Sequence, residues 1–391
     1  MKYFISIIEF FIRIKFNFNN PKKSEIILFD DETHGVMKNV LDDYKYFLLK
    51  SRVENITCIY LTKKILFLFI KNFNGNIMTA YLAALIEVIN PKIIVTHIDN
   101  SLKFSDLAKK LHKKFHFLAI QNAYRAEIAE HKFRFKNKII SVDNTKKFYI
   151  PNLLCFGKFE VNLYKKYKIK VKNFFVVGSL RLANFNYYLK KFKINLKKDK
   201  YDICLVAESF TGRNELFGKK DFEEKAVLLI KFVIKFCKEH NKKLVFPLKY
   251  SNKNSELTYF RKYLSSEEYN FLIKKSLKRK DDFSTYLTMS QSKVSVGIIS
   301  TILSEMLAVD QKILSCNLTP TQLWDFPVKG IHSIKNCDYK TFEKRLLKIY
   351  KMSKKEYISK IKKNKNYLVD YKKRYSTIEK IKNRINYFLS L

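Results

Sequence analysis

Short apolar runs alternate with helical patterns along most of the chain after Pro21. Runs such as 25–30 (EIILFD), 92–99 (KIIVTHID) and 116–123 (HFLAIQNA) predict buried strands. The segments between them, for example 76–89 (NIMTAYLAALIEVI), carry apolar residues at helical spacing. Strands that are apolar throughout and separated by helices are typical of a parallel sheet covered on both faces. The first half therefore predicts an α/β domain.

The same alternation starts again after the lysine-rich stretch 189–200. Strands are expected within 201–209, 243–250, 293–299 and 312–317, with a long helix over 223–240 between the first two. A helix is also expected over 34–46, whereas 63–71 (KKILFLFIK) fits a strand or a helix equally well.

The predicted fold is an α/β architecture with two Rossmann-like domains facing a cleft and a basic helical C-terminal tail. We expect an amphipathic segment at 1–20, domains at 21–170 and 171–338, and basic helices at 339–391.

Both ends of the chain have distinctive patterns. Residues 1–18 are apolar but interrupted by Glu9 and Arg13, so they predict an amphipathic helix that lies on a bilayer or docks on the protein's own core. No run of 18 apolar residues exists, which argues against a spanning helix. From Lys340 onward the chain has 17 Lys and Arg against 4 Asp and Glu, with Tyr, Ile and Leu at helical spacing.

The chain of 391 residues has a formal charge of +41, which favours anionic partners. Abundant Lys, Asn, Ile and Phe beside only 8 Gly and 6 Pro indicate a coding bias that supplies much of the lysine. The charge is thus compatible with an anionic membrane surface or a phosphorylated substrate. No nucleic-acid motif occurs and aromatic residues lie within apolar runs, so a nucleic-acid partner is not expected. Six scattered cysteines without zinc spacing fit a reducing cytoplasm and no metal site.

Polar residues follow most of the predicted strands, where α/β sheets bind ligands. Each of these residues could equally be a helix cap or a turn residue. Asp99 is the first candidate for a general base because it ends a buried strand, with His97 two residues earlier and Asp31 and Glu32 after the first strand as rivals. His97 could equally be a core histidine.

Several segments together resemble a known family. They are PKIIVTHIDN, FLAIQNAYR, VVGSLR, VSVGIISTILSEMLA and DYKTFEKRLLKIYKMSKKEYISK. The chain resembles, from about Pro21 onward, the surface carbohydrate biosynthesis proteins of bacteria, which are glycosyltransferases of the GT-B architecture. Its second half is more distantly similar to capsule Kdo transferases and to glycerophosphate transferases of teichoic acid assembly. One departure is Ala123, which stands where the family pattern I-Q-N-G-x-R has glycine.

The resemblance implies a glycosyltransferase that uses a nucleotide-sugar donor and a lipid-linked or glycan acceptor to build a capsule or O-antigen type polysaccharide. It places the donor phosphates at Ser300 and Thr301, at the start of a helix, and the ribose at Glu305. Arg181 and Lys249 would supply cations in place of a metal, since no DxD motif occurs.

Three further residues, Gln121, Asn122 and Arg125, would face the acceptor or the sugar. No cofactor is expected, because the nucleotide-sugar is a substrate. The alternatives are a phosphoalditol transferase of the same fold, a non-catalytic scaffold and a nucleic-acid-binding protein.

Overall fold

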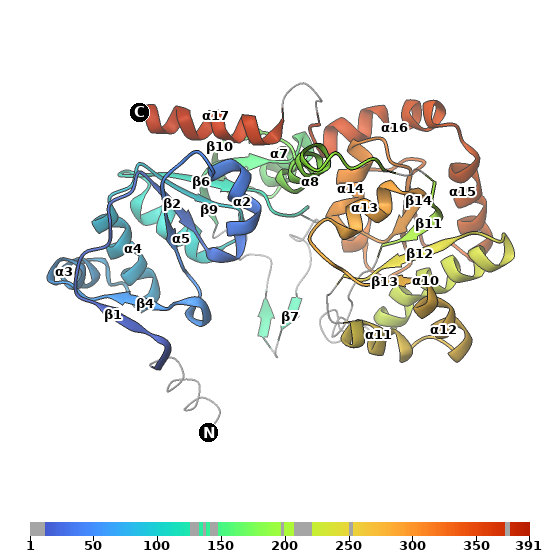
Figure 1. Ribbon diagram of the computed structural model, residues 1–391, viewed down its shortest axis with the longest axis horizontal. Helices are drawn as coiled ribbons and strands as arrows, with labels where there is room; N and C mark the ends of the chain where they lie inside the picture. The colour runs from blue at the N-terminus through green and yellow to red at the C-terminus, as the bar shows by residue number, and fades with distance from the viewer. Residues whose placement is uncertain are drawn as a thin grey trace.

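The computed structural model describes residues 12–125, 133–135, 138–140, 148–196, 199–206, 221–249, 253–371 and 376–391. Two α/β domains stand side by side, each built on a six-stranded sheet in which every described pairing is parallel (Figure 1). This confirms the predicted fold class.

The N-terminal sheet has the strand order β10-β9-β6-β5-β2-β3. Its strands are β2 (Ile26–Phe29), β3 (Tyr46–Leu49), β5 (Ile93–Thr96), β6 (His116–Ile120), β9 (Tyr149–Cys155) and β10 (Lys170–Val176). Its helices are α2 (His34–Leu41), α3 (Lys63–Asn72), α4 (Ile77–Ile89), α5 (Leu102–Leu111), α7 (Lys158–Lys166) and α8 (Leu180–Lys191).

Alternate residues of these strands enter two different cores, which explains why the strands are apolar throughout. Ile27 and Phe29 pack in one core with α3, α4 and α5. Ile26 and Leu28 pack in the other with α2 and with α17 (Thr377–Ser390), the last helix of the chain.

The C-terminal sheet has the order β13-β12-β11-β14-β15-β16. Its strands are β11 (Tyr201–Leu205), β12 (Leu244–Pro247), β13 (Ser276–Leu277), β14 (Ser292–Gly297), β15 (Ile313–Asn317) and β16 (Ser333–Lys335). Its helices are α10 (Phe222–Glu239), α11 (Lys253–Arg261), α12 (Ser266–Lys275), α13 (Ser284–Ser290), α14 (Thr301–Ala308), α15 (Tyr339–Lys351) and α16 (Lys354–Leu368).

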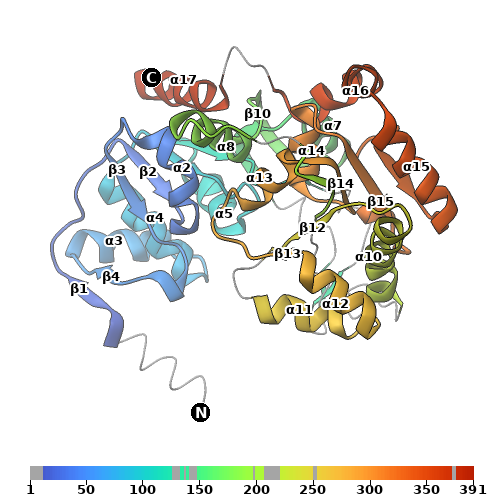
Figure 2. The ribbon, with the colours of Figure 1, turned by 45° about the vertical axis from the view of Figure 1, so that its right-hand side comes forward.

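The chain returns to the first domain at its end, as Figures 1 and 2 show for α17. The crossing segment passes so close to Gly157 and Gly178 that a Cβ on either glycine would lie 2.4 Å from a backbone oxygen of Leu368 or Asp370. Gly178 also has a φ of +92°, which other residues rarely adopt. Both glycines are therefore needed for the tail to link the two domains.

The structure corrects several expectations. The helix expected over 34–46 ends at Leu41, and 46–49 form β3. Segment 58–60 is β4 (Cys58–Tyr60), which pairs with β1 (Lys15–Asn17) outside the main sheet. The predicted N-terminal helix therefore does not extend through 15–17, and 1–11 lie outside the described residues.

The domain boundary also lies later than expected. β10 pairs with β9 along its whole length, so 171–176 belong to the first domain rather than the second. Of the basic tail, α15 and α16 bury Phe342, Leu346 and Tyr357 in the second domain, whereas α17 packs on the first.

Candidate functional site

The C-terminal sheet reverses its strand order between β11 and β14. From β11 the chain builds outward to β12 and β13, then returns to place β14 on the other side of β11. In open α/β sheets, the carboxyl ends of the strands at such a reversal leave a crevice where ligands bind. A cavity of about 300 Å³ lies there, which we call the switch-point pocket. Its lining includes Asn122, Arg181, Pro247, Lys249, Arg279, Asp282, Tyr286, Ser300, Thr301 and Glu305.

All five residues predicted to bind the nucleotide-sugar line this one cavity. Ser300, Thr301 and Glu305 come from α14 and its cap, Arg181 from the first turn of α8, and Lys249 from the end of β12. They span more than 120 positions of the sequence, and the fold brings them together. Their binding role stays a prediction.

The two hydroxyl residues at the start of α14 differ in their contacts. Ser300 is the N-cap residue, but its side chain makes no capping hydrogen bond. The Thr301 hydroxyl accepts a hydrogen bond of 3.0 Å from the backbone N–H of Tyr124, in the other domain. The first N–H groups of a helix have no intrahelical partner and carry its positive end, so this corner attracts an anion.

Three cationic side chains surround the pocket. Arg279, which the sequence analysis did not single out, donates to the backbone oxygen of Lys249 at 3.1 Å and pairs with Asp282. Arg181 is half-buried, and its guanidinium makes no hydrogen bond or ion pair within the described part of the chain. A guanidinium whose donors are not used within the described residues, beside a helix N-terminus, can bind a phosphate bidentately.

Glu305 is fully buried and already has two partners. The hydroxyls of Ser179 and Tyr286 each donate to one of its carboxylate oxygens, the latter at 2.6 Å. Burial raises the pKa of Glu305, against the lowering effect of these two bonds and of Arg181. Each carboxylate oxygen has a second lone pair, so a ribose hydroxyl could still bind, but only as an additional donor. Since Ser179 begins α8, this contact also joins the two domains.

The first candidate base, Asp99, is occupied. Its carboxylate, with no exposed surface, accepts from the Arg125 guanidinium at 3.0 Å and through a second, shorter bond. It also accepts from the Asn122 N–H at 3.1 Å and the Tyr164 hydroxyl at 3.0 Å. Four donors leave no free lone pair for a substrate proton, so the geometry does not support Asp99 as a general base.

The rival bases also have distinct surroundings. His97 is 1% exposed, and neither ring nitrogen has a hydrogen-bond partner among the residues that the structure describes. Burial, reinforced by Arg181 and Arg125, lowers the pKa of His97 to about 3, so the ring is neutral at pH 7. Glu32 is half-exposed and pairs with Arg52, and it does not line the switch-point pocket.

Two of the three residues predicted to face the acceptor are internal. The Gln121 amide donates to the Ala123 oxygen at 2.9 Å and accepts from the Phe156 N–H at 2.8 Å, which uses both ends of the side chain. Arg125 is held by Asp99 and by the Asn122 side chain. Asn122 alone of the three lines the switch-point pocket.

Sequence reasoning missed Glu160 and Tyr164, which complete this buried cluster from α7. Glu160 accepts from the Arg125 backbone N–H at 3.2 Å, and burial raises its pKa to about 8. Nothing in the sequence marks them, because α7 reads as an ordinary amphipathic helix.

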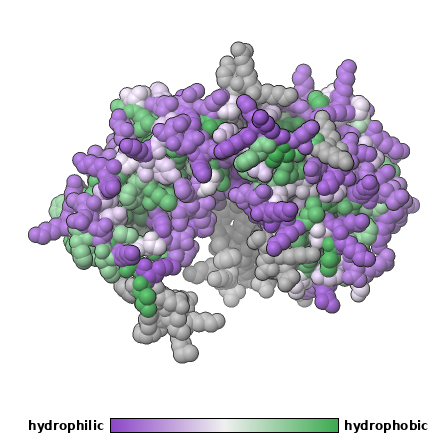
Figure 3. Space-filling model, viewed as in Figure 1, coloured by the Kyte–Doolittle hydropathy of each residue, from purple (hydrophilic) through white to green (hydrophobic). Residues whose placement is uncertain are grey.

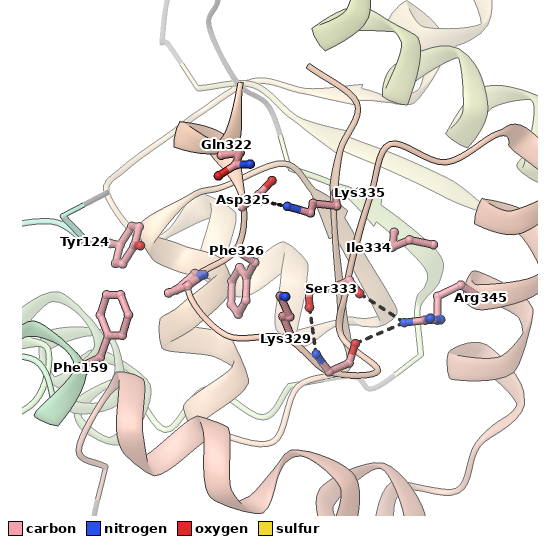
Figure 4. A pocket seen from close by; sticks show the side chains of 12 residues that line it. Tyr124, Phe159, Gln322, Asp325, Phe326, Lys329, Ser333, Ile334, Lys335 and Arg345 are labelled. Carbon is pink, nitrogen blue, oxygen red and sulfur yellow. Dashed lines mark hydrogen bonds and ion pairs between the residues drawn. The ribbon is translucent and has the colours of Figure 1, made fainter. Parts of the chain in front are cut away.

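A larger cavity of about 680 Å³ lies on the other side of Tyr124 (Figure 4), and we call it the aromatic pocket. Tyr124 and Phe159 come from the first domain, their rings 5.6 Å apart. The opposite wall is formed by Phe326 and by Lys329 and Lys335, which follow β15. Lys335 pairs with Asp325, while Arg345 fixes the loop by donating to three backbone oxygens, including that of Ser333. The sequence analysis had not singled out this cavity.

Comparison with solved structures supports the architecture. No protein-family model matches the chain, and no curated protein matches it in sequence. Its fold is similar to the wall teichoic acid polymerase TagF, with a TM-score of 0.55 and 11% identity over 94% of this chain and 90% of that one.

Two further structures cover nearly all of both chains. One is a glycosyltransferase from Rickettsia africae ESF-5, with a TM-score of 0.50 and 12% identity over 95% of this chain and 99% of that chain. The other is the UDP-GlcNAc 2-epimerase of Neisseria meningitidis bound to UDP-GlcNAc, with a TM-score of 0.53 and 13% identity over 93% and 99%. At such identities the likeness establishes the fold, which is the GT-B arrangement of two Rossmann-like domains that the resemblance implied.

Proposed function

We propose that the protein is a glycosyltransferase that binds a nucleotide-activated sugar in the switch-point pocket. The observation that carries the proposal is the convergence of Arg181, Lys249 and Arg279 on the start of α14. Such a site fits a diphosphate, and the same cations would stabilise the negative charge on the departing nucleotide. Two of the solved structures with this fold are a glycosyltransferase and a nucleotide-sugar epimerase, which supports a nucleotide-sugar as the substrate class.

The aromatic pocket is the proposed site of the acceptor glycan. It meets the switch-point pocket at Tyr124, whose backbone N–H contacts Thr301 while its ring lines the larger cavity. Aromatic faces with a few polar groups are typical of sites that bind small organic ligands. Lys329, which is exposed, could pair with a phosphate that links the acceptor to a lipid.

The biological setting is proposed on the same basis. A capsule or O-antigen type polysaccharide on a lipid carrier would place the enzyme at the cytoplasmic face of the membrane. No described helix is long and apolar enough to span a bilayer, so association would be peripheral.

A second candidate is a phosphoalditol transferase, which the likeness to a teichoic acid polymerase favours. It would use the same pocket, because its donor is also a nucleotide diphosphate derivative. Product analysis separates the two, since the phosphoalditol enzyme releases a nucleoside monophosphate where most glycosyltransferases release a diphosphate.

The first experiment is a thermal-shift screen of CMP, CDP, UDP, GDP and their sugars, followed by calorimetry with the best ligand. A ligand that binds the folded state alone raises the melting temperature with its concentration over its dissociation constant. Failure of every nucleotide to stabilise the protein, together with tight polynucleotide binding, would overturn the proposal.

The second experiment tests metal independence during transfer. If fixed cations replace a metal, activity should persist in EDTA. Activity that is lost in EDTA and restored by manganese would show that a bound metal is required.

Of the candidate bases, His97 is the one that has no hydrogen-bond or ion-pair partner among the described residues, so we propose to test it first. We expect His97→Gln to lower kcat while leaving nucleotide affinity unchanged. An unchanged kcat would remove it from the chemistry.

A further inference from the structure

One end of the N-terminal domain exposes an unusual number of large apolar side chains. They lie on β1 and the residues around it, on α3, at Phe73 directly after it, and at the start of α4. The set comprises Ile12, Phe16, Phe18, Leu66, Phe67, Ile70, Phe73 and Ile77. Phe18, Phe67 and Ile70 are 73%, 67% and 72% exposed. We call these eight residues the α3–β1 surface.

The two segments lie side by side in the fold. β1 pairs with β4, which leads directly into α3, and the Leu61 N–H donates to the Asn17 oxygen at 2.8 Å. The Thr62 hydroxyl donates to the Asn20 side chain at 2.8 Å. Figures 1 and 2 both place β1, β4 and α3 together, and Figure 3 shows hydrophobic surface at this end of the molecule.

Helix α3 is apolar on both of its faces, although only one is covered. Ile65 is fully buried in the N-terminal core, and Leu68 and Phe69 pack against it. Leu66, Phe67 and Ile70 are 48%, 67% and 72% exposed, so about half or more of each side chain is left uncovered by the described part of the chain. A helix that is hydrophobic all round is ordinarily buried on all sides, so the outer face of α3 calls for a second apolar medium.

The two segments that carry this surface are basic. Segments 12–24 and 61–77 contain no Asp or Glu, and their basic residues are exposed. These are Arg13, Lys15, Lys22, Lys23, Lys63, Lys64 and Lys71. Apolar and aromatic side chains interspersed with lysine are the pattern of a face that enters the boundary of an anionic bilayer. Protein-binding patches are depleted of lysine, which favours lipid over a protein partner.

We propose that the α3–β1 surface docks the protein on an anionic lipid bilayer, with Leu66, Phe67, Ile70 and Ile77 entering the interface. The lysines pair with lipid phosphates while the apolar side chains supply a salt-resistant part of the binding. If the proposed function is right, this surface would bring the cleft to a lipid-linked acceptor in the cell. Vesicle binding itself needs no nucleotide and no transfer.

The test is co-sedimentation of the full chain with vesicles of phosphatidylcholine containing phosphatidylglycerol, and with phosphatidylcholine alone. We compare Phe67→Ser/Ile70→Ser with Phe192→Ser/Leu277→Ser, a control pair of exposed apolar residues outside the surface. The native chain and the control should bind anionic vesicles, and part of that binding should survive about 1 M salt. The Phe67→Ser/Ile70→Ser variant should lose that salt-resistant part at least tenfold.

Two further variants separate the contributions. The Lys63→Ser/Lys64→Ser/Lys71→Ser variant should bind anionic vesicles more weakly than the native chain at low salt. Its salt-resistant binding and its binding to phosphatidylcholine alone should not change. A chain that begins at Ile12 should keep its salt-resistant binding, because α3 provides it. Circular dichroism and melting curves identify any variant that fails to fold, in which case Phe67→Trp, tested for quenching by brominated lipid, supplies the readout.

Three outcomes would overturn the proposal. The first is that the Phe67→Ser/Ile70→Ser variant binds vesicles as well as the native chain does. The second is that vesicle binding is lost only when residues 1–11 are deleted. The third is that the native chain binds no vesicles but forms a dimer in sedimentation, and that the variant abolishes this dimer. Nucleotide calorimetry on the same variants, without lipid, reports on the proposed function separately. A nucleotide-binding protein that ignores vesicles refutes the surface alone, and the reverse result refutes the function alone.

Discussion

Both domains have a six-stranded parallel sheet whose strand order reverses once, but the polar residues at the two reversals are arranged differently. The N-terminal sheet reverses between β2 and β5, and there the charges are paired and buried, as Asp99 is by Arg125 and Asp30 by Arg52. The C-terminal sheet reverses between β11 and β14, and there Arg181 lacks a partner within the described residues and faces a cavity. The paired charges at the first point do not support the free base expected there, whereas the cations that line the cavity at the second are suited to binding an anion.

This contrast shows why polar strand ends cannot be assigned from sequence alone. Both reversals present carboxylates, amides and arginines after apolar strands. A charge acts as a ligand or base only where its neighbours leave it unsatisfied, and a buried charge without a partner is costly. The charged residues at the first reversal are paired with one another, so they should contribute chiefly to the stability of the fold. The second should contribute chiefly to affinity.

The largest effect should come from breaking the pair at the first reversal. Asp99→Asn leaves the Arg125 guanidinium, 13% exposed, without its counter-charge and should cost about 3–5 kcal/mol of unfolding free energy. Urea unfolding measures this. The control is Asp106→Asn, which removes an exposed pair with Lys109 and should cost under about 1 kcal/mol. A stable Asp99→Asn protein that has lost only turnover would restore Asp99 as a base.

The same cluster should make stability depend on pH through Glu160. Burial raises its pKa from 4.5 to about 8, so the folded state holds a proton that the unfolded state releases. This contribution is fully present below pH 4.5 and is lost as the pH rises through 8, by at most about 1.4 kcal/mol for each unit.

Glu160→Gln removes this titration while keeping an acceptor for the Arg125 N–H. The difference in unfolding free energy between the variant and the native chain should therefore grow in favour of the variant from pH 5 to pH 8. Taking the difference cancels other groups, including His97, whose lowered pKa acts in the opposite sense at acid pH. Parallel curves would mean that Glu160 is ionised in the folded protein.

At the second reversal the effect should move from stability to affinity. Arg181→Met removes an unpaired cation, so we expect little change in unfolding but a ten- to hundredfold loss of nucleotide affinity, since a hydrogen bond to a charged group contributes about 1.5–3 kcal/mol. Lys190→Met removes an exposed charge from the same helix as a control. Equal losses from both variants would indicate a diffuse effect of net charge.

Much of the fold follows from local pattern, and the exceptions have specific causes. α14 begins and ends where the sequence indicates, because a polar pair precedes it and its apolar spacing is regular. β3 was missed because the preceding helix was expected to run to Tyr46, and it is a strand because it pairs with β2. β9 was missed as well, although its seven residues lie between β6 and β10 in the sheet.

The candidate site was predictable in membership but not in contacts. Strand ends and resemblance together selected the five residues that line the switch-point pocket. They could not show that Ser179 and Tyr286 bind Glu305, since those partners come from distant elements. Nor could they show that Asp99 is paired, because pairing depends on the turn after β6 bringing Arg125 back to the end of β5.

The smallest effect should distinguish the two adjacent hydroxyls at the start of α14. Thr301→Val removes the acceptor of the Tyr124 N–H and should cost about 1 kcal/mol of unfolding free energy, because a half-buried hydrogen bond between the domains is lost. Ser300→Ala removes a hydroxyl that does not cap the helix, so unfolding should change by less than about 0.5 kcal/mol. If Ser300 contacts the donor phosphate, its variant should instead lose affinity in calorimetry, whereas Thr301→Val should lose less. A reversed pattern would mean that Thr301 leaves Tyr124 to bind the ligand, and that the contact between the domains opens when the nucleotide enters.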